Sequence, residues 1–589
     1  MQSIHYYLIL ILLTVSASHA STATYTFDTQ NRLTKETQVD GTTLEYQYDN
    51  QSNRTQLKTS KGTEIKIVGY GFDSLNRLST VTDAIGTTSY SYDAVGNRSK
   101  VTHANGNTDN YVYDSLNRLT TLTHKSSAGT TLSSYTYSLD ATGKRTKITE
   151  ATGRVTDYSY DNLNRLKTET ITDATNGNYN AEYTYDKVGN RTYETVDGVQ
   201  TQYTYDDNDR LSQQGGTTYT YDNNGSTLTE TLDGNSKTYS YNAKNQLTET
   251  SNAGSTTSYQ YNADGIREAQ TTGSETTQYI VDSNRAYAQV IEERSNNATT
   301  VSYTYGDDLL SQTRNGTTNT YHYDGLGSTR ALSDSTGAFT DLYNYEAFGE
   351  VLNQTGVTVN DYLFAGEQFD QNLGQYYLRA RYYDQGVGRF TQQDEWLGKI
   401  CSPITLNKYI YTDSNPVNGI DPSGYFTMSN LMSGLNIGAR LGTNSVGQYT
   451  RFTVSGKGGV TKKIGCFVGV SYIKKQYTGD GNHGHHTIPK NLGGDPNQAL
   501  LFLPAETHRM VHFVLHVVLK NTPELNGKGN WTSKEDWSSK TMTRNGRKQL
   551  YKALLRTSKI VDKFCKLKGP ESLTRYVRKG RKSFLAEVK

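Results

Sequence analysis

Histidines with regular spacing are concentrated in one short segment of this sequence. Six of the eleven lie within NHGHHTIPKNLGGDPNQALLFLPAETHRMVHFVLHVVLK, which runs from 482 to 520. The last three, His508, His512 and His516, are four residues apart, and in a helix this spacing puts them on one face. Two imidazoles one helical turn apart can bind one metal ion, and a third from a neighbouring element can complete the site.

The surrounding residues predict the elements that position these histidines. The adjacent pair at 485–486 is followed by a Gly-Gly turn signal at 493–494, and the apolar run 499–503 leads to Pro504 and Glu506. Proline and an acidic residue suit the first turn of a helix. We therefore expect a strand, a turn and a helix that bring the adjacent pair toward the helical histidines. A metal ion there would stabilise charge on a phosphate, while a free histidine would act as general base toward water.

The pattern HHxxPxxxGG, then Asn497, then His-x3-His resembles the HNH or ββα-metal nuclease superfamily, in particular the GHH/LHH-type toxin nucleases and the colicin-type DNases. The resemblance implies that His486 is the general base and that Asn497 fixes the hairpin or orients this base. It also implies that His485, His508 and His512 bind a divalent metal, either Mg²⁺ or Zn²⁺ or another transition metal. The substrate expected from it is DNA, with RNA as the alternative.

Two histidines fall outside this expected site, since His483 is predicted in a surface loop and His516 as buried or spare. The segment has two other interpretations: a structural zinc site without chemistry, or histidines that only complete a core. Cys401, Cys466 and Cys565 have no paired spacing. They argue against a disulfide scaffold and against a four-cysteine zinc site.

The net charge of +2 is a cancellation between two opposed parts of the chain. Residues 425–589 contain 28 basic and 9 acidic residues, a balance of +19, and residues 1–424 contain 32 basic and 49 acidic, a balance of −17. Affinity for phosphate backbones is largely electrostatic, so the basic part is suited to a nucleic-acid partner. The alternative for any single lysine or arginine is ordinary solvated surface.

A repeat explains why the chain has 47 tyrosines but only 14 phenylalanines. Its unit is Tyr-x-Tyr/Phe-Asp followed after two or three residues by Asn-Arg or Gly-Asn-Arg. Tyr-x-Tyr alternation puts both rings on one face of a strand, and the following Asp, Asn and Gly are turn formers. Each unit is therefore predicted to be a β-hairpin that buries its aromatic face only by stacking on its neighbours. The leading tyrosines are Tyr25, Tyr46, Tyr70, Tyr90, Tyr111, Tyr135, Tyr158, Tyr183, Tyr203, Tyr219, Tyr239 and Tyr259.

These units resemble the YD repeats of Rhs and teneurin-type proteins. YHYDGLGSTRALSDSTG, LGQYYLRARYYDQGVGRFTQQD and the closing NPVNGIDPSG resemble the Rhs-associated core. The resemblance implies a mostly β fold, in which a spiral of β-hairpins forms a hollow shell and a small α+β domain of the ββα-metal (HNH-like) kind follows. It further implies a polymorphic toxin whose C-terminal nuclease acts in a competing cell, and an immunity protein, which should be acidic to match the basic domain.

Members of that family often cleave themselves after a leucine that follows the DPxG motif, using core aspartates. Here Tyr425 takes the place of the leucine and Glu395 follows the first core aspartate instead of proline. The resemblance therefore predicts autoproteolysis after Tyr425 with Asp394 and Asp421 taking part. The alternative is that both aspartates are ordinary turn residues.

The predicted organisation has five parts: a signal peptide at 1–20, YD repeats at 21–320, the Rhs-associated core at 321–425, a connector at 426–472 and the nuclease domain at 473–589. The apolar run YYLILILLTVSA near the N-terminus fits an export signal and is too short to cross a membrane, although no Lys or Arg precedes it. We therefore expect a secreted or exported protein without a stable membrane span, delivered by secretion machinery.

Two further interpretations of the whole chain stay open. A cell-surface adhesion or carbohydrate-binding protein would account for the repeats and the export signal, but not for the basic region and the clustered histidines. A degenerate nuclease would bind metal without cleaving nucleic acid.

Overall fold

The computed structural model describes residues 23–398, 403–425, 428–429, 482–486 and 500–504. The chain divides into two compact units, of which the first holds the described residues up to 429 and the second holds the two short segments beyond. The expected signal peptide, the connector apart from residues 428–429 and most of the expected nuclease domain lie outside the described residues.

The first unit is built on one 32-stranded sheet. Its strands are β1 Thr24–Phe27, β2 Leu33–Thr37, β3 Thr43–Tyr48, β4 Arg54–Lys61, β5 Glu64–Phe72, β6 Leu78–Thr82, β7 Thr87–Tyr92, β8 Arg98–Thr102, β9 Thr108–Tyr113, β10 Leu119–Lys125, β11 Thr131–Leu139, β12 Arg145–Glu150, β13 Val155–Tyr160, β14 Leu166–Thr172, β15 Tyr179–Tyr185, β16 Arg191–Val196, β17 Val199–Tyr205, β18 Leu211–Gln214, β19 Thr217–Tyr221, β20 Thr227–Leu232, β21 Asn235–Tyr241, β22 Leu247–Asn252, β23 Ser255–Tyr261, β24 Arg267–Thr272, β25 Glu275–Asp282, β26 Gln289–Ser295, β27 Ala298–Tyr305, β28 Leu309–Arg314, β29 Thr317–Tyr323, β30 Thr329–Ser333, β31 Phe339–Tyr345 and β32 Val351–Thr355.

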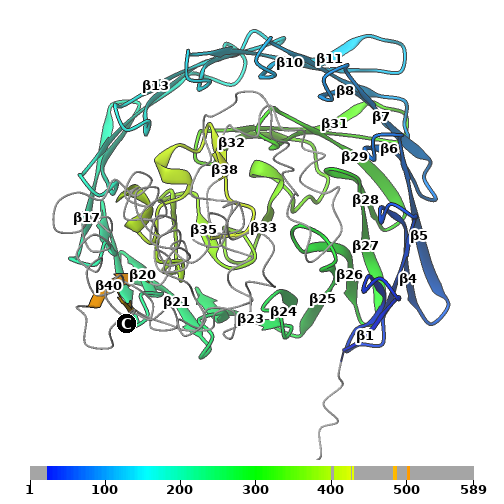
Figure 1. Cartoon of the computed structure of the whole chain (residues 1–589). Helices are drawn as coiled ribbons and strands as arrows, with labels where there is room; N and C mark the ends of the chain where they lie inside the picture. Colours follow the sequence, from blue (N-terminus) through cyan, green and yellow to red (C-terminus); the bar gives the residue numbers. More distant parts are fainter. Residues whose placement is uncertain (1–22, 399–402, 426–427, 430–481, 487–499, 505–589) are drawn as a thin grey trace, which may run out of the picture. The chain divides into compact units, whose positions relative to one another are not determined.

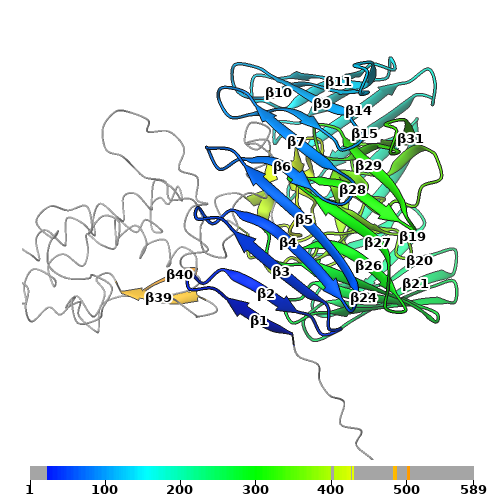
Figure 2. The same ribbon diagram turned by 90° about the vertical axis from the view of Figure 1, so that its right-hand side faces the viewer.

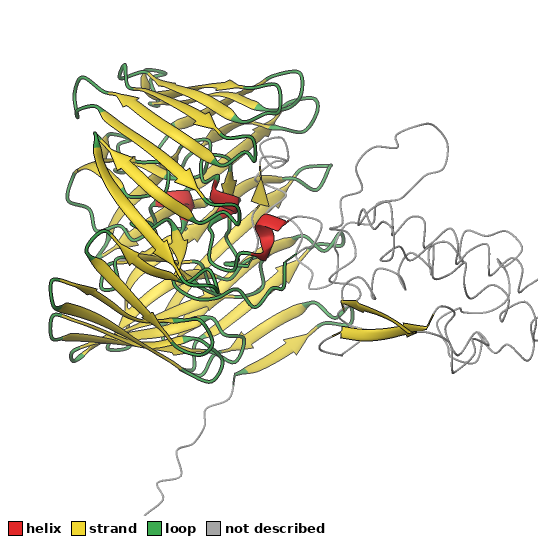
Figure 3. Ribbon diagram, turned by 90° about the vertical axis from the view of Figure 1, so that its left-hand side faces the viewer, coloured by secondary structure: helices red, strands yellow, loops and turns green. Residues whose placement is uncertain are grey.

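Smaller elements follow the large sheet. They are the 3₁₀ helices η1 Phe364–Gly366, η2 Pro403–Leu406 and η3 Thr412–Ser414, a four-stranded sheet of β33 Gln368–Asp370, β34 Gln375–Tyr377, β35 Tyr382–Asp384 and β36 Arg389–Phe390, and the pair β37 Gly419–Ile420 and β38 Met428–Ser429. In the second unit, β39 Asn482–His486 pairs with β40 Leu500–Pro504. Helix in the described residues is thus limited to three short 3₁₀ turns, drawn in red in Figure 3.

The large sheet is a spiral in which each strand pairs antiparallel with the next one along the chain, as in the first pairs. Figure 1 shows the strands running around a ring from β1 through β13 and β21, after which β26–β29 return to lie inside β4–β7. Figure 2 shows the same two layers from the side. The predicted mostly β fold with hairpin units is confirmed for the first unit, and the sheet continues past 320 as far as β32.

The aspartate of each repeat closes the turn that follows the tyrosine strand. In the turn after β7, the backbone N–H groups of Val95 and Asn97 donate to Asp93 Oδ1 at 3.0 and 2.8 Å. The Asn97 side-chain amide donates to Asp93 Oδ2 at 2.9 Å. An aspartate that accepts from its own backbone two and four residues on is a local turn signal, so the predicted turn chemistry is confirmed.

The two tyrosines of each repeat have different roles on the same face of the strand. Tyr90 is buried, Tyr92 is partly buried, and Ser91 between them is exposed. The Tyr92 hydroxyl donates to the backbone carbonyl of Leu78 in the preceding hairpin at 2.7 Å, and the Arg77 guanidinium lies 4.2 Å from the centre of the Tyr92 ring. Arginine over an aromatic face is attractive. The second tyrosine thus joins consecutive hairpins, and seven more make the same kind of bond: Tyr48, Tyr113, Tyr160, Tyr185, Tyr205, Tyr323 and Tyr345.

Where the spiral overlaps itself, the inner strands are buried on both faces. All five residues of β30 are buried, and so are five of the seven in β26. Buried ion pairs and hydrogen bonds join the two layers. Arg54 Nη1 of β4 lies 2.6 Å from Asp282 Oδ2 of β25, and Lys66 Nζ of β5 donates to the Tyr303 carbonyl of β27 at 2.8 Å.

The chain after β32 lies inside the ring, where β33 and β35 are drawn in Figure 1. This inner segment contacts the sheet through buried pairs such as Arg267 Nη1 to Asp370 Oδ2, 2.5 Å apart. Aromatic rings fill it, with Tyr383 and Tyr411 stacked at 4.1 Å between centroids. None of the helices among the described residues is long and apolar enough to span a membrane.

The first tyrosine of a repeat should contribute more to stability than the residue beside it. Tyr183 is 1% exposed and contacts Phe348 and the Arg191 guanidinium at 5.1 and 4.7 Å. Tyr183→Ala should lower the free energy of unfolding by about 3–5 kcal/mol because it leaves a cavity. The matched control Thr184→Ala, on the exposed face, should change it by about 0.5 kcal/mol or less. Urea unfolding followed by circular dichroism measures both, and equal losses would contradict the predicted roles.

Candidate functional site

Two aspartates predicted to act together converge on one arginine at the end of the inner segment. Arg381 Nη2 lies 3.0 Å from Asp394 Oδ2 and 3.7 Å from Asp421 Oδ2. All three side chains are at least nine-tenths buried, with exposed fractions of 5%, 9% and 2%. Arg381 directly precedes β35. Asp394 follows β36, and Asp421 follows β37. The structure therefore brings together both aspartates that the sequence singled out.

The same arginine holds the peptide bond that follows the DPSG sequence. Arg381 Nε donates to the carbonyl oxygen of Gly424, and Arg381 Nη1 donates to the Lys408 carbonyl at 2.9 Å. On the other side of this bond, the Tyr425 N–H donates to Asp421 Oδ1 at 3.2 Å and to Ser423 Oγ at 3.1 Å. A cation at the carbonyl oxygen and a carboxylate at the nitrogen thus flank one peptide bond.

Glycine is required at 424 because the backbone there is left-handed and closely packed. Its φ is +70°, and an added Cβ would lie 2.5 Å from the Leu378 carbonyl oxygen and 3.0 Å from the Arg381 nitrogen. A second arginine of the same motif, Arg379, donates to the Pro422 carbonyl and pairs with Glu367 at 2.7 Å. The DPSG turn is thus held by two arginines of LGQYYLRARYYD, whose roles the sequence analysis missed although the motif was recognised.

Burial governs the charge states in this cluster. It raises the pKa of the Asp394 carboxyl above its ordinary value, although the Arg381 charge opposes the shift. It also lowers the pKa of the Arg381 guanidinium. Burial penalises the charged form of each group, so Asp394 keeps its proton to higher pH than an exposed aspartate does.

The described residues of the second unit form one hairpin that carries part of the expected nuclease motif. β39 and β40 pair antiparallel, with His485 opposite Leu501 and His486 opposite Leu500. His483 lies in β39 opposite Leu503, so its predicted place in a loop is wrong. Backbone pairing extends to His483 because the partner strand continues beyond Leu501 to Pro504.

The predicted start of the helix needs a similar correction. Pro504 ends strand β40 opposite Asn482, where it was expected in the first turn of a helix. Proline lacks an N–H but is tolerated at the edge or end of a strand. Asn497, His508, His512 and His516 lie outside the described residues, so their predicted roles stay predictions.

Known families match the part of the chain that forms the spiral. The RHS repeat matches residues 27–64 and 72–108, and the teneurin YD-shell matches residues 142–417. The matched residues coincide with the hairpins whose tyrosines and aspartates are described above. These residues are an RHS/YD-repeat shell.

Proteins named as nucleases and as a toxin are among the curated relatives of this chain. The tRNA3(Ser)-specific nuclease WapA of Bacillus spizizenii is 33% identical over 401 residues, covering 67% of this chain and 11% of the relative. The tRNA nuclease WapA of Bacillus subtilis is 32% identical over 401 residues with the same coverage. The Double-stranded DNA deaminase toxin A of Burkholderia cenocepacia is 34% identical over 113 residues, or 18% of this chain and 7% of the relative. The chain spans about a tenth of the length of the WapA relatives.

A solved structure with the same fold is the crystal structure of TcdB2-TccC3. It aligns with a TM-score of 0.52 at 19% identity, over 68% of this chain and 22% of that chain. At this identity the likeness establishes the shell fold alone.

The cluster around Arg381 has the groups that hydrolysis of a peptide bond requires at the end of the YD shell. Water would add to the Gly424 carbonyl carbon, Arg381 would stabilise charge on the carbonyl oxygen, and Asp421 lies where the nitrogen leaves. One carboxylate would accept the proton from water while the other donates one to the nitrogen. These contacts belong to the bond before Tyr425, and cleavage after Tyr425, next to a residue outside the described ranges, stays a prediction.

Autoproteolysis predicts a specific pattern of fragments from the purified full chain. Intact-mass spectrometry should find two fragments, and their masses distinguish cleavage before Tyr425 from cleavage after it. Asp421→Asn and Asp394→Asn should slow the reaction by about 100-fold or more, because each removes an acid or base. The control Glu395→Gln, at the exposed neighbour of Asp394, should cleave normally. A wild-type chain that stays intact at 65.6 kDa would contradict self-cleavage.

Proposed function

We propose that this chain is an Rhs-type toxin in which the YD shell precedes a metal-dependent nuclease of the HNH kind. The observation that carries the proposal is the hairpin of β39 and β40, which places the adjacent His485 and His486 at the end of one strand. In this proposal, the two paired strands with their histidine pair would be the first two elements of a ββα-metal motif. The basic balance of +19 in residues 425–589 suits a phosphate-rich substrate.

RNA is the better supported substrate, although the sequence analysis expected DNA. Relatives that share the shell at 32–33% identity carry the names of tRNA nucleases. Residues 426–589 number 164 (589 − 425), so most of a 401-residue match must fall in the repeats. The names therefore support a nuclease toxin and favour RNA, while the C-terminal residues of this chain decide the substrate.

The residues of the second unit have distinct roles in this proposal. His486 takes a proton from the attacking water, and Asn497 orients that imidazole or fixes the loop of the hairpin. His485, His508 and His512 hold a divalent metal, because imidazole nitrogens suit zinc and other transition metals. When bound, the metal supplies positive charge that stabilises the phosphate as it is attacked.

The charge of the C-terminal region suggests a binding partner for this toxin, and the expected signal peptide suggests how it is exported. A domain at +19 should bind an acidic immunity protein whose surface complements it. We propose export through the segment 1–20 and secretion machinery, followed by action of the nuclease in the target cell. A surface-adhesion protein, one of the alternatives, gives no role to the histidines of β39, and a degenerate nuclease would bind metal without cleaving nucleic acid.

Loss of the general base should abolish nucleic-acid cleavage by the full chain. His486→Ala should lower the rate by about 100-fold to 10,000-fold, the usual contribution of an acid–base group. The matched control His483→Ala, three residues earlier on the same strand, should keep the wild-type rate. The wild-type chain and the two variants are each incubated with tRNA and with plasmid DNA, and fragments are resolved on denaturing gels. Faster cleavage of the plasmid would overturn RNA as the substrate, and full activity of His486→Ala would overturn the assigned base.

Removal of divalent metal should stop the same reaction. Dialysis against EDTA should abolish cleavage, and addition of Mg²⁺ or Zn²⁺ in excess should restore it, because charge stabilisation at the phosphate is lost and regained. His508→Ala and His512→Ala should raise the metal concentration needed for half-maximal activity. Cleavage that persists in EDTA at an unchanged rate would contradict a metal-dependent nuclease.

A further inference from the structure

The histidines of the YD shell all meet at one buried carboxylate. The described residues from 23 to 429 contain three histidines, His103, His124 and His322. Each has a ring nitrogen next to a carboxylate oxygen of Asp109: His103 Nε2 is 2.8 Å from Oδ2, His124 Nδ1 is 2.5 Å from Oδ1 and His322 Nδ1 is 3.3 Å from Oδ1. Exposed side-chain fractions are between 0% and 4%.

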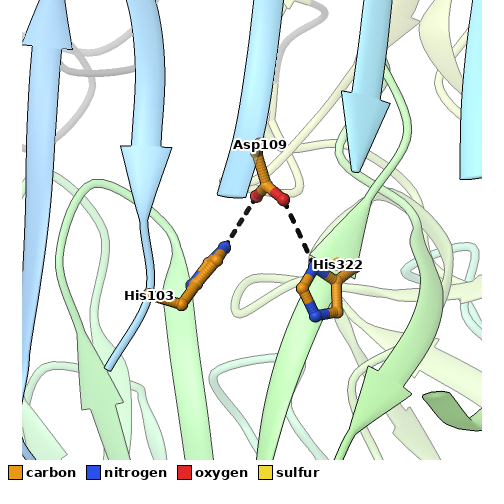
Figure 4. Close-up of side chains that lie close together, drawn as sticks. All are labelled: His103, Asp109 and His322. Atoms are coloured by element: carbon orange, nitrogen blue, oxygen red, sulfur yellow. Dashed lines mark hydrogen bonds and ion pairs between the residues drawn. The ribbon is translucent and has the colours of Figure 1, made fainter. Parts of the chain in front are cut away.

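These four residues come from both layers of the overlapping spiral. His103 follows β8, Asp109 lies in β9 and His124 in β10, whereas His322 lies in β29, 213 residues from Asp109. Figure 4 shows His103 and His322 pointing toward Asp109 from different strands. The cluster therefore lies where the inner and outer layers of the shell are in contact.

Two of the histidines occupy positions that the Tyr-x-Tyr-Asp repeat leaves open to any residue. The backbone of His103 makes the turn bonds that an aspartate makes elsewhere: its N–H donates to the Asn107 carbonyl and its carbonyl accepts from Gly106, both at 2.9 Å. His322 is the middle residue of a Tyr-x-Tyr strand, where Ser91 in β7 faces solvent. The repeat specifies neither residue, and both side chains contact the same carboxylate of Asp109.

From this geometry we infer that His103, His124, His322 and Asp109 bind one structural zinc ion that fastens the inner layer of the shell to the outer layer. Ligand atoms of His103, Asp109 and His322 already lie within 4.8 Å of one another, and His124 contacts the same carboxylate. A tetrahedral zinc site has bonds of about 2.0–2.2 Å, so the four side chains must rotate to bring their ligand atoms around one ion.

The second nitrogens of two imidazoles have the hydrogen bonds that metal-binding histidines usually make. His124 Nε2 lies 2.9 Å from the Tyr323 carbonyl oxygen, which only accepts, so this nitrogen carries a proton. His322 Nε2 lies 2.9 Å from Ser333 Oγ, which is also bonded by the Asn105 amide at 2.9 Å. These partners orient both rings, and the proton on His124 Nε2 leaves Nδ1 of that ring for a metal.

The donor set selects the metal. Three imidazoles and one carboxylate suit zinc, whereas Mg²⁺ and Ca²⁺ prefer oxygen ligands. Four protein ligands and full burial leave no open position for substrate, as in structural zinc sites.

The test uses the full chain in a background that removes the proposed nuclease site. His485→Ala, His508→Ala and His512→Ala are combined, and the purified chain is incubated with ZnCl₂, desalted and analysed by mass spectrometry for metal. About one zinc ion per chain should remain, as a closed four-ligand site predicts. Adding His322→Gln should reduce the content to near zero. The control Asp157→Asn, which changes a half-exposed partner of Lys147 at 3.1 Å, should leave it unchanged.

A second measurement needs no change in the cluster, so it holds even if His322→Gln fails to fold. Titration of the background chain with Co²⁺ should give the visible absorption of a tetrahedral histidine site, saturating at one equivalent. Zinc should raise the melting temperature of this chain above that in EDTA. A folded chain that binds neither ion and melts at the same temperature in both would overturn the proposal and leave a hydrogen-bonded network. Nuclease activity is measured separately on a chain with intact His485, His508 and His512, so the two proposals fail independently.

Discussion

The tyrosine hydroxyl is the constraint on which the shell depends. A hairpin of this repeat has a face of tyrosine rings that must leave water, and each buried hydroxyl then needs a hydrogen-bond partner. The Tyr92 hydroxyl finds it in the Leu78 carbonyl of the preceding hairpin at 2.7 Å. The partner is outside the unit, so a single hairpin cannot satisfy its own tyrosines. Consecutive hairpins are thereby joined in sequence order, and a continuous spiral sheet results.

The overlap of the spiral creates a second requirement, because strands buried on both faces must carry any polar group into the interior. Asp282 is 0% exposed and is paired with Arg54 at 2.6 Å and with Arg285 at 3.0 Å. Removing one partner of such a pair typically costs about 3–5 kcal/mol, because the other charge stays buried. These pairs therefore specify which inner strand faces which outer strand. The cluster around Asp109 meets the same requirement with three histidines. A zinc ion bound by this cluster would hold the inner and outer layers together more strongly.

The end of the described shell is held by contacts within the shell itself. The inner segment ends with Asp421 and Gly424 held by Arg379 and Arg381, so the last described residues of the shell are positioned by its own core. Relatives of this chain carry names as different as tRNA nuclease and DNA deaminase toxin. In the proposed function, the residues after the DPSG sequence would determine the activity.

Much of the shell was predictable because the residues within each repeat determine its strands and its turn. Alternating tyrosines determine a strand face, and an aspartate followed by Asn or Gly determines the turn, so hairpins and their order follow from the residues alone. The hairpin that carries His485 and His486 was also expected, but its ends were not, because the pairing of His483 and Pro504 depends on how far the partner strand extends. Strand ends are decided by the partner strand and not by local sequence.

Contacts between distant residues were beyond the sequence. Nothing local relates Arg381 to Asp394, Asp421 and Gly424, or His322 to Asp109, which is 213 residues away. Each residue alone matches a turn, a strand or a charged surface. Only the closure of the spiral, which places later strands inside earlier ones, makes them neighbours. The sequence by itself thus determined the repeating hairpin and the residue types available for chemistry, whereas the tertiary structure decided which of them meet, because the closure of the spiral buries charged groups of distant strands beside one another.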